Sequence, residues 1–293
     1  MTLSMSPTIE HFVASDGYRL GARHWRPDQT PRGFVVALHG IQSHGGWYEF
    51  SSRRMCEAGY DVLFADRRGS GLNAARRGDT PHAERLLNDV VQVLTEVRRR
   101  RDHLAPQATV VLLAVSWGGK LAAITAARRP ELVDALALLY PGLCSRVCPT
   151  VTQRARLWLA RTLDIRHKRI EIPLNDPALF TAEPRWQEFI LRDPLTLRDV
   201  TSGFLLAHQY LTRESLAAAP LINCPTLLML AGRDRIIDND ATKAWSRQLG
   251  TSELTFQEYA DAQHTLEFEP HPEQFVSDLI AWLKHHPSRS GEE

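Results

Sequence analysis

Short, uninterrupted runs of apolar residues recur along the chain and are separated by amphipathic segments. Runs of this length, rich in valine, leucine and alanine, are typical of strands buried on both faces of a parallel sheet. The alternation with helical segments predicts an α/β fold with a mostly parallel sheet and helices on both faces. We expect strands at residues 34–38, 60–65, 110–115, 135–139, 225–231 and 253–259, and helices at 51–58, 84–101, 121–127 and 273–285.

The beginning and the middle of the chain depart from this pattern. Apolar and polar residues alternate on both sides of Asp16-Gly17, at residues 9–15 and 19–25, which predicts a β-hairpin. After residue 142 the strand runs stop, prolines become frequent, and helical periodicity appears around 151–163 and 197–211. We interpret this middle part as a helical cap over the carboxyl ends of the strands. The expected division is a core of residues 1–142 and 221–286, a cap of residues 143–220, and a disordered tail at 287–293.

The composition is that of an ordinary water-soluble globule. Of 293 residues, 43% are hydrophobic and 24% charged, and the formal net charge of +1 gives no reason to expect nucleic acid as a partner. The chain has no stretch of about 18 apolar residues to span a bilayer, and its first residues lack the pattern of a signal peptide. We expect a cytoplasmic protein without an integral membrane segment, with peripheral lipid contact left open. The four cysteines lack the spacing of a metal or redox site, so we expect no metal.

The strand expected at 110–115 ends at Ser116, which is followed by Trp117, two glycines and the helix at 121–127. This arrangement resembles the nucleophile elbow of α/β-hydrolases, in which a sharp turn raises a serine hydroxyl above the carboxyl end of the sheet. The resemblance implies that Ser116 is a catalytic nucleophile. Ala114 stands where the elbow pattern has its first glycine, which is a modest departure.

A serine nucleophile needs a histidine base, and the base needs a carboxylate that holds its tautomer. In α/β-hydrolases these residues follow in the order serine, acid, histidine. Asp234 comes directly after the strand at 225–231 and is our candidate acid. Asp238 is the alternative, but it stands at the expected start of a helix, where N-capping explains it. His264 lies between the last strand and the last helix and is our candidate base.

Acyl transfer also requires backbone N–H groups that bind the oxyanion. We expect them at Trp117, directly after the nucleophile, and at Ile41, in the loop after the first buried strand. In the same loop, His39 is interpreted as a brace, and His44 as a structural residue or a contact at the edge of the substrate. The Asp-x-Arg-Gly-x-Gly turn at residues 66–71 is interpreted as a brace of the loops below the site.

These motifs together resemble the monoglyceride lipase and lysophospholipase group of α/β-hydrolases. The resemblance runs from about Phe12 to the final helix. It implies an α/β-hydrolase fold with an eight-stranded sheet, a cap between the sixth and seventh strands, and a serine esterase without metal or cofactor. The implied substrates are acylglycerols, lysophospholipids or other small lipophilic esters. The motifs are His39-Gly40, Ser43-His44-Gly45-Gly46, the turn at 66–71, the elbow at Ser116, Gly232-x-Asp234-x-x-x-Asp238 and His264.

Aromatic residues of the cap suit a lipophilic acyl group. The candidates for substrate contact are His44, Trp158, Trp186, Phe189 and Phe204. The same triad also serves proline iminopeptidase-like peptidases, acyltransferases and carbon–carbon bond hydrolases, and a ligand-binding protein can retain it. The sequence does not distinguish these alternatives from an esterase, nor does it predict the acyl chain length or the oligomeric state.

Overall fold

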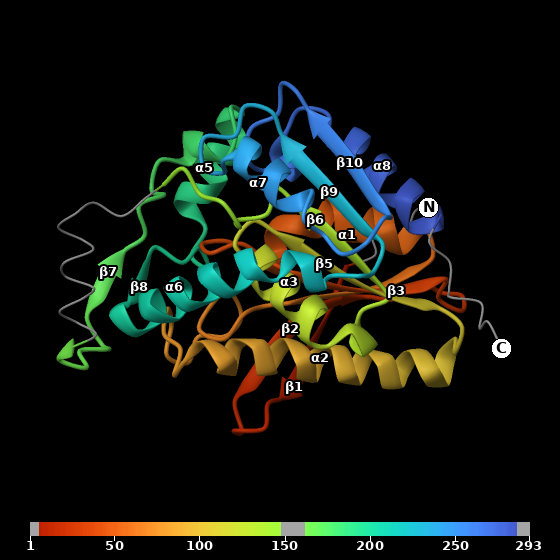
Figure 1. The fold of residues 1–293 in the computed structure, drawn as a ribbon, viewed down its shortest axis with the longest axis horizontal. Coiled ribbons are helices and arrows are strands. Elements are labelled where there is room, and N and C mark those ends of the chain that lie inside the picture. The colour runs from red at the N-terminus through yellow and green to blue at the C-terminus, as the bar shows by residue number, and fades with distance from the viewer. Residues whose placement is uncertain (1–5, 148–161, 286–293) are drawn as a thin grey trace.

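The computed structural model describes residues 6–147 and 162–285 and has a central sheet of eight strands in the order β1-β2-β4-β3-β5-β6-β9-β10 (Figure 1). Neighbouring strands are parallel except at the two pairs that include β2, so β2 alone runs against the others. This confirms the mostly parallel, eight-stranded sheet expected from the sequence. The strands are β1 (Thr8–Val13), β2 (Arg19–Trp25), β3 (Gly33–Leu38), β4 (Tyr60–Ala65), β5 (Thr109–Val115), β6 (Ala135–Leu139), β9 (Thr226–Ala231) and β10 (Leu254–Tyr259).

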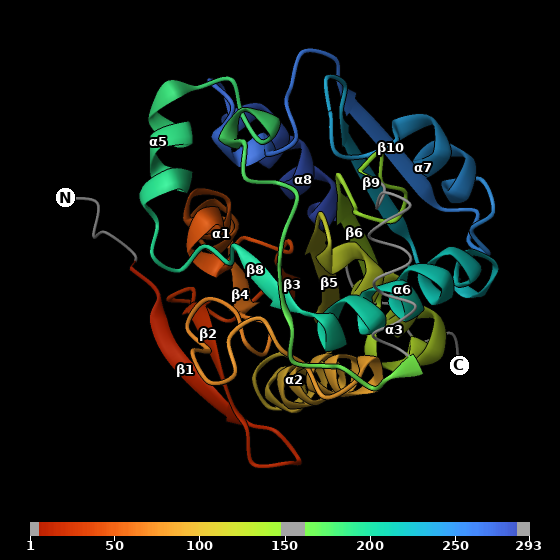
Figure 2. The ribbon, with the colours of Figure 1, turned by 90° about the vertical axis from the view of Figure 1, so that its left-hand side faces the viewer.

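Helices cover both faces of this sheet. α1 and α8 lie on one face, and α2 and α3 lie on the other (Figures 1 and 2). Every residue of β3, β4, β5, β6 and β9 is consequently buried, which is why these strands appear in the sequence as mostly apolar runs. The helices outside the segment between β6 and β9 are α1 (Glu49–Glu57), α2 (Ala83–Leu104), α3 (Gly118–Arg128), α7 (Asn239–Ser246) and α8 (Glu273–His285).

Most of the predicted elements are confirmed. β4, β6 and α8 have the predicted bounds, and β1 and β2 form the expected hairpin. α2 extends three residues beyond its predicted end, to Leu104. α7 begins after Asp238, as the capping interpretation required.

The described residues between β6 and β9, 140–147 and 162–225, lie across the carboxyl ends of the parallel strands, in front of the sheet in Figure 2. The sequence predicted only helices here, but β7 (Arg169–Glu171) and β8 (Asp199–Thr201) form a small antiparallel sheet. Strands of three residues are too short to show a periodicity. α6 (Ser202–Ala217) begins later than the predicted residue 197, because residues 199–201 pair with β7 and Thr201 caps the helix. α5 (Pro184–Arg192) was not predicted.

Other predictions concern residues that the structure does not describe. The helix expected at 151–163 lies outside the described residues except for its last two, and so do Trp158 and the tail at 287–293. The division into a core of 1–142 and 221–286 and a cap of 143–220 remains a prediction. None of the helices in the described ranges is both long and apolar enough to cross a membrane. Within the same ranges, no group of three or more His, Cys, Asp or Glu side chains could hold a metal ion.

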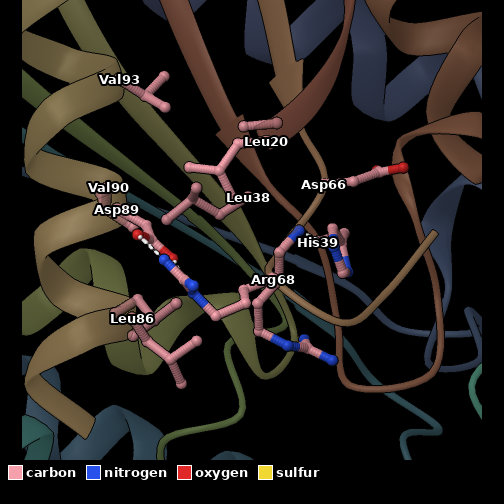
Figure 3. A pocket seen from close by; sticks show the side chains of 12 residues that line it. Leu20, Leu38, His39, Asp66, Arg68, Leu86, Asp89, Val90 and Val93 are labelled. Carbon is pink, nitrogen blue, oxygen red and sulfur yellow. Dashed lines mark hydrogen bonds and ion pairs between the residues drawn. The ribbon is translucent and has the colours of Figure 1, made fainter. Parts of the chain in front are cut away.

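A small cavity lies between α2 and the sheet, behind the loop that follows β3 (Figure 3). Its volume is about 30 Å³, and apolar side chains such as Leu86 and Val93 line it. Arg68 and Asp89 form a 2.8 Å ion pair at its edge, in line with the bracing role expected of the 66–71 turn. The space suffices for a water molecule or two and not for an ester, so this cavity is not a substrate site.

Candidate active site

Ser116 lies at the sharp turn between β5 and α3. Its φ of +49° falls in the left-handed region, which costs a non-glycine residue roughly 1–2 kcal/mol. Backbone hydrogen bonds hold the turn: the Ser116 N–H donates to the Leu139 carbonyl at 3.1 Å. The Ser116 carbonyl accepts from the N–H groups of Gly119 and Gly142 at 2.9 and 2.6 Å. The elbow expected from the sequence is therefore present, with its serine in a strained conformation.

The start of α3 lies so close to the loop after β3 that a side chain would not fit. A Cβ added to Gly118 would lie 2.8 Å from the carbonyl oxygens of both Leu38 and His39. Ala114, in place of the first elbow glycine, is fully buried in β5, and the turn forms nevertheless. In this chain the elbow therefore requires a glycine at position 118 and not at position 114.

Ser116, His264 and Asp234 form one hydrogen-bonded chain. His264 Nε2 lies 2.9 Å from Ser116 Oγ, and His264 Nδ1 lies 2.7 Å from Asp234 Oδ2. The other carboxylate oxygen of Asp234 accepts hydrogen bonds from the N–H groups of Ile236 and Ile237, at 2.8 and 2.9 Å. Asp234 and His264 are buried. The three residues selected from the sequence are thus brought together in space.

These hydrogen bonds assign the tautomer of His264. A carboxylate only accepts, so the proton of the neutral imidazole lies on Nδ1 and the lone pair of Nε2 faces the Ser116 hydroxyl. The rings of Tyr140 and Phe180 lie edge-on to the imidazole, with centroids 5.0 and 5.8 Å away. The histidine is therefore held in the orientation in which it can take a proton from Ser116.

Two alternative candidates have structural partners. Asp238 accepts a hydrogen bond from the Ala241 N–H at the start of α7, as expected for an N-cap. His39 Nε2 accepts from the Arg67 N–H, and His39 Nδ1 donates to the Gly40 carbonyl. Burial lowers the pKa of His39 well below its usual range, so the ring stays neutral. Both residues brace the backbone, as the sequence indicated.

His44 connects the loop after β3 to the segment between β6 and β9. Its Nδ1 accepts from the Gly46 N–H at 3.0 Å, so its Nε2 donates to Asp193 Oδ2 at 2.8 Å. Trp47 Nε1 donates to the same oxygen at 2.8 Å. Burial alone would raise the pKa of Asp193, but these hydrogen bonds outweigh it and hold the pKa well below its usual range. The contacts support the structural interpretation of His44.

The loop that carries Ile41 lies directly beside the nucleophile. A Cβ added to Gly40 would lie 3.3 Å from Ser116 Cβ. Neither the Ile41 N–H nor the Trp117 N–H donates a hydrogen bond to another described residue. Both donors expected for the oxyanion are therefore available next to Ser116.

Trp117 contacts the helix that covers this side of the site. Its ring stacks on Phe204 of α6, with centroids 5.3 Å apart, and its Nε1 donates to His208 Nδ1 at 2.8 Å. Burial, reinforced by Lys120, lowers the pKa of His208 to about 3, so His208 is neutral and can accept this bond. Phe204 is thus held near the elbow, and its contact with substrate stays a prediction.

Trp186 and Phe189 belong to a second aromatic cluster, around Phe268. Trp186 stacks on Phe268 at 4.6 Å, and Phe189 lies edge-on to it at 5.9 Å. Both rings are half-buried. The predicted aromatic contacts that the structure describes therefore fall into two groups, one at Trp117 and one around Phe268.

Sequence reasoning missed Tyr140, Asp193, His208 and Arg67. Tyr140 follows β6 at its carboxyl end, and this position could have indicated a residue close to the site. Asp193 and His208 lie between β6 and β9, where no pattern indicated a partner across the chain. Arg67 was assigned only to the 66–71 turn, yet its guanidinium donates to the carbonyls of Gly40 and Ile41.

Comparison with known proteins agrees with this geometry. A profile of the family described as serine aminopeptidase, S33, matches residues 29–271. Monoglyceride lipase from Mus musculus is 24% identical over 291 residues, which cover 97% of this chain and 92% of that protein. Monoacylglycerol lipase from Mycolicibacterium smegmatis is 24% identical over 287 residues, covering 96% of this chain and 99% of the relative.

A solved structure shows the same fold. A soluble variant of monoglyceride lipase from Saccharomyces cerevisiae matches with a TM-score of 0.86 at 18% identity, covering 99% of this chain and 98% of the other. The α/β-hydrolase fold and the hydrolase group expected from the sequence are confirmed, and the expected class, a serine ester hydrolase, agrees with the names of the relatives. The family profile spans far more than half of the sequence, and the chain therefore belongs to the serine aminopeptidase S33 family of α/β-hydrolases.

Proposed function

We propose that this chain hydrolyses carboxylic esters of lipophilic substrates through an acyl-enzyme on Ser116. Ser116 Oγ attacks the ester carbonyl while His264 Nε2 takes its proton, and the N–H groups of Ile41 and Trp117 bind the oxyanion. The protonated His264 then returns the proton to the departing alkoxide. Water, activated by His264, releases the carboxylic acid and restores the serine.

The observation that carries this proposal is the hydrogen-bonded chain from Ser116 through His264 to Asp234, with distances of 2.9 and 2.7 Å. A serine hydroxyl attacks only when a base removes its proton, and a base at hydrogen-bond distance supplies that step. Asp234 stabilises the imidazolium that forms, because its charge is buried and its second oxygen is already hydrogen-bonded. The arrangement thus supports acyl transfer to a serine.

A lipophilic substrate is supported by the rings at the site and by the relatives. Trp117 stacks on Phe204 next to the nucleophile, and Phe180 lies edge-on to His264. All three rings are buried, so they make the surroundings of the triad apolar, which favours an apolar acyl or alcohol group. The relatives named monoglyceride lipase and monoacylglycerol lipase support an acylglycerol or a similar ester.

The first experiment is hydrolysis of nitrophenyl esters from acetyl to palmitoyl by the wild type and by Ser116→Ala. We expect the variant to lose about four orders of magnitude in kcat or more, as in other serine hydrolases. Ser15→Ala, in the exposed β1–β2 hairpin, is the matched control and should keep full activity. A fluorophosphonate should label the wild type and the control but not Ser116→Ala.

The substrate panel also tests the alternatives. Release of nitroaniline from aminoacyl nitroanilides, with the esters untouched, would replace the esterase by an aminopeptidase, as the name of the family suggests. A folded wild type that cleaves neither class and takes no fluorophosphonate label would favour a ligand-binding protein. Preference for long acyl chains over acetyl would support the lipase-like substrate over a small ester.

A further inference from the structure

Arg67 places a buried guanidinium directly behind the loop that carries Ile41. Its NH1 donates to the Gly40 carbonyl at 3.1 Å, and its NH2 donates to the Ile41 carbonyl at 3.0 Å. The residue is 8% exposed. Among the ion pairs of the described residues, none includes Arg67.

The neighbouring carboxylate does not neutralise this charge by direct contact. The oxygens of Asp66 accept from the N–H groups of Gly45 and Leu72 and from the Arg23 guanidinium. Burial lowers the pKa of Arg67 to about 9, so the side chain is still protonated at neutral pH. A buried cation without a carboxylate partner is costly for the folded protein and is expected where it has a function.

One of the two hydrogen bonds of Arg67, the bond to the Gly40 carbonyl, acts on the peptide group that carries the proposed oxyanion donor. The Gly40 carbonyl and the Ile41 N–H belong to the same peptide unit, and this N–H is a donor of the proposed oxyanion hole. The Gly40 carbonyl also accepts a hydrogen bond from His39 Nδ1 at 2.7 Å. It therefore has two donors, Arg67 and His39, and both polarise it. Donors on the carbonyl polarise a peptide and make its N–H a stronger donor. They also fix the plane of the peptide, and thus the direction of the N–H.

Arg67 contacts the second donor of the oxyanion hole as well. Its guanidinium carbon lies 4.8 Å from the centre of the Trp117 ring and 5.2 Å from that of Phe204. One side chain therefore packs against both residues whose N–H groups are expected to bind the oxyanion, Ile41 through its carbonyl and Trp117 through its ring.

We propose that Arg67 is a positioning residue of the oxyanion hole, which aligns and polarises the Gly40–Ile41 peptide and supplies a buried positive charge behind it. The proposal rests on the proposed function. The substrate carbonyl is neutral and the tetrahedral intermediate is an anion, so this charge stabilises the transition state more than the ground state. Arg67 should consequently affect kcat and leave substrate binding almost unchanged.

The test compares Arg67→Met, Arg67→Gln and Arg67→Lys with the wild type on a nitrophenyl ester. A donor aimed at the oxyanion is worth about 10²–10³ in kcat, so weakening one without removing it should lower kcat of Arg67→Met about 10–100-fold. We expect KM to stay within about threefold. A trifluoromethyl ketone, which forms a tetrahedral oxyanion with the serine, should lose affinity by the same factor as kcat/KM. Arg67→Lys, which keeps the charge, should retain more activity than Arg67→Gln, which keeps only a donor.

Arg68→Met is the matched control. Arg68 belongs to the same turn and is equally buried, but it pairs with Asp16 and with Asp89 of α2, and Figure 3 shows the pair with Asp89. We expect this variant to lower the melting temperature and to keep kcat. A merely structural role of Arg67 would give the pattern of the control.

The outcomes separate the two proposals. A wild type that hydrolyses no ester and binds no ketone overturns the proposed function, and this inference with it. A wild type that is active while Arg67→Gln and Arg67→Lys keep its kcat and its ketone affinity overturns the inference alone. The same holds if the variants raise KM at unchanged kcat. Should Arg67→Met not fold, the other two variants decide the question.

Discussion

Replacing Asp234 by asparagine should remove almost all ester hydrolysis while leaving the fold intact. The reason lies in the hydrogen bonds of this side chain. One oxygen of Asp234 accepts from the N–H groups of Ile236 and Ile237, and the other faces His264 Nδ1. In Asp234→Asn the remaining oxygen must stay with the two backbone donors, so the NH₂ group faces His264. The imidazole then accepts at Nδ1 and carries its proton on Nε2, opposite the Ser116 hydroxyl, where it cannot act as a base.

The size of the loss can be derived from this change of tautomer. In a serine protease triad the same substitution lowers kcat about 10⁴-fold with the geometry preserved. A factor of 10⁴ corresponds to about 5.5 kcal/mol of transition-state stabilisation at 1.36 kcal/mol per factor of ten. The two backbone hydrogen bonds persist in the variant, so we expect the melting temperature to change little.

The assay is ester hydrolysis together with thermal unfolding, with Asp238→Asn as the control. Asp238 caps α7 through its side chain, and the hydrogen bonds and ion pair of His264 go to Ser116 and Asp234 instead, so the variant should keep kcat and lose at most about 1–2 kcal/mol of stability. Loss of less than tenfold in kcat for Asp234→Asn would contradict the assignment of the acid. A loss of about 10⁴ in the control instead would identify Asp238 as the acid.

Three other predictions concern the framework of the site. Gly118→Ala would place a Cβ 2.8 Å from two backbone oxygens. We expect about 1–3 kcal/mol of destabilisation with a loss of kcat, and an unchanged urea midpoint would contradict the steric argument. Outweighing the effect of burial, hydrogen bonds from His44 and Trp47 hold the pKa of Asp193 below its usual value of 3.8, so its contribution to stability is present above pH 4 and disappears as the pH falls further. Asp193→Asn should therefore flatten the decline of melting temperature below pH 4, and a parallel decline would argue against this linkage. Burial raises the pKa of Glu267 from 4.5 to about 7, so the native state holds a proton that the unfolded chain has lost, and stability falls as the pH rises through this range. The melting temperature of Glu267→Gln relative to the wild type should rise between pH 5 and pH 8, and a constant difference would refute the shift.

The core of the fold could be predicted because its strands are buried on both faces. β4 and β6 are unbroken runs of buried residues bounded by polar or glycine positions, so their ends coincide with the ends of the runs. α8 has a clear buried face with Phe275, Leu279 and Leu283. In such elements the residues that form the structure are neighbours in sequence, and the pattern is local.

The elements described between β6 and β9 were not predicted, because they depend on contacts between residues that are far apart in the sequence. β7 and β8 are three residues each, and their pairing joins positions that are 28 to 32 residues apart, from Glu171 with Asp199 to Arg169 with Thr201. α5 begins at Pro184 and buries only Ile190 among its residues. Neither feature leaves a periodicity in the sequence that a short window can reveal.

The candidate triad was found because each member stands at the carboxyl end of a strand, a position visible in the sequence. Ser116 follows β5, Asp234 follows β9 and His264 follows β10. Arg67 also follows a strand, β4, and was still missed, because its role depends on the carbonyls of a loop that is distant in sequence. Position at a strand end therefore predicts which residues reach the site, and the contacts decide what each can do.

Ala114 and Trp117, on either side of Ser116, have different consequences for the site. Ala114 lies within β5, paired with Leu38 and Leu138, and it is fully buried while the turn after it keeps its geometry. Trp117 has contacts beyond the turn. Its ring extends to α6, where it stacks on Phe204 and donates a hydrogen bond to His208. The hydrogen bonds of the triad do not involve this ring. We expect Trp117 to influence which acyl chains are accepted, so that Trp117→Met, assayed on nitrophenyl esters from acetyl to palmitoyl, shifts the preferred chain length, and an unchanged profile would contradict this.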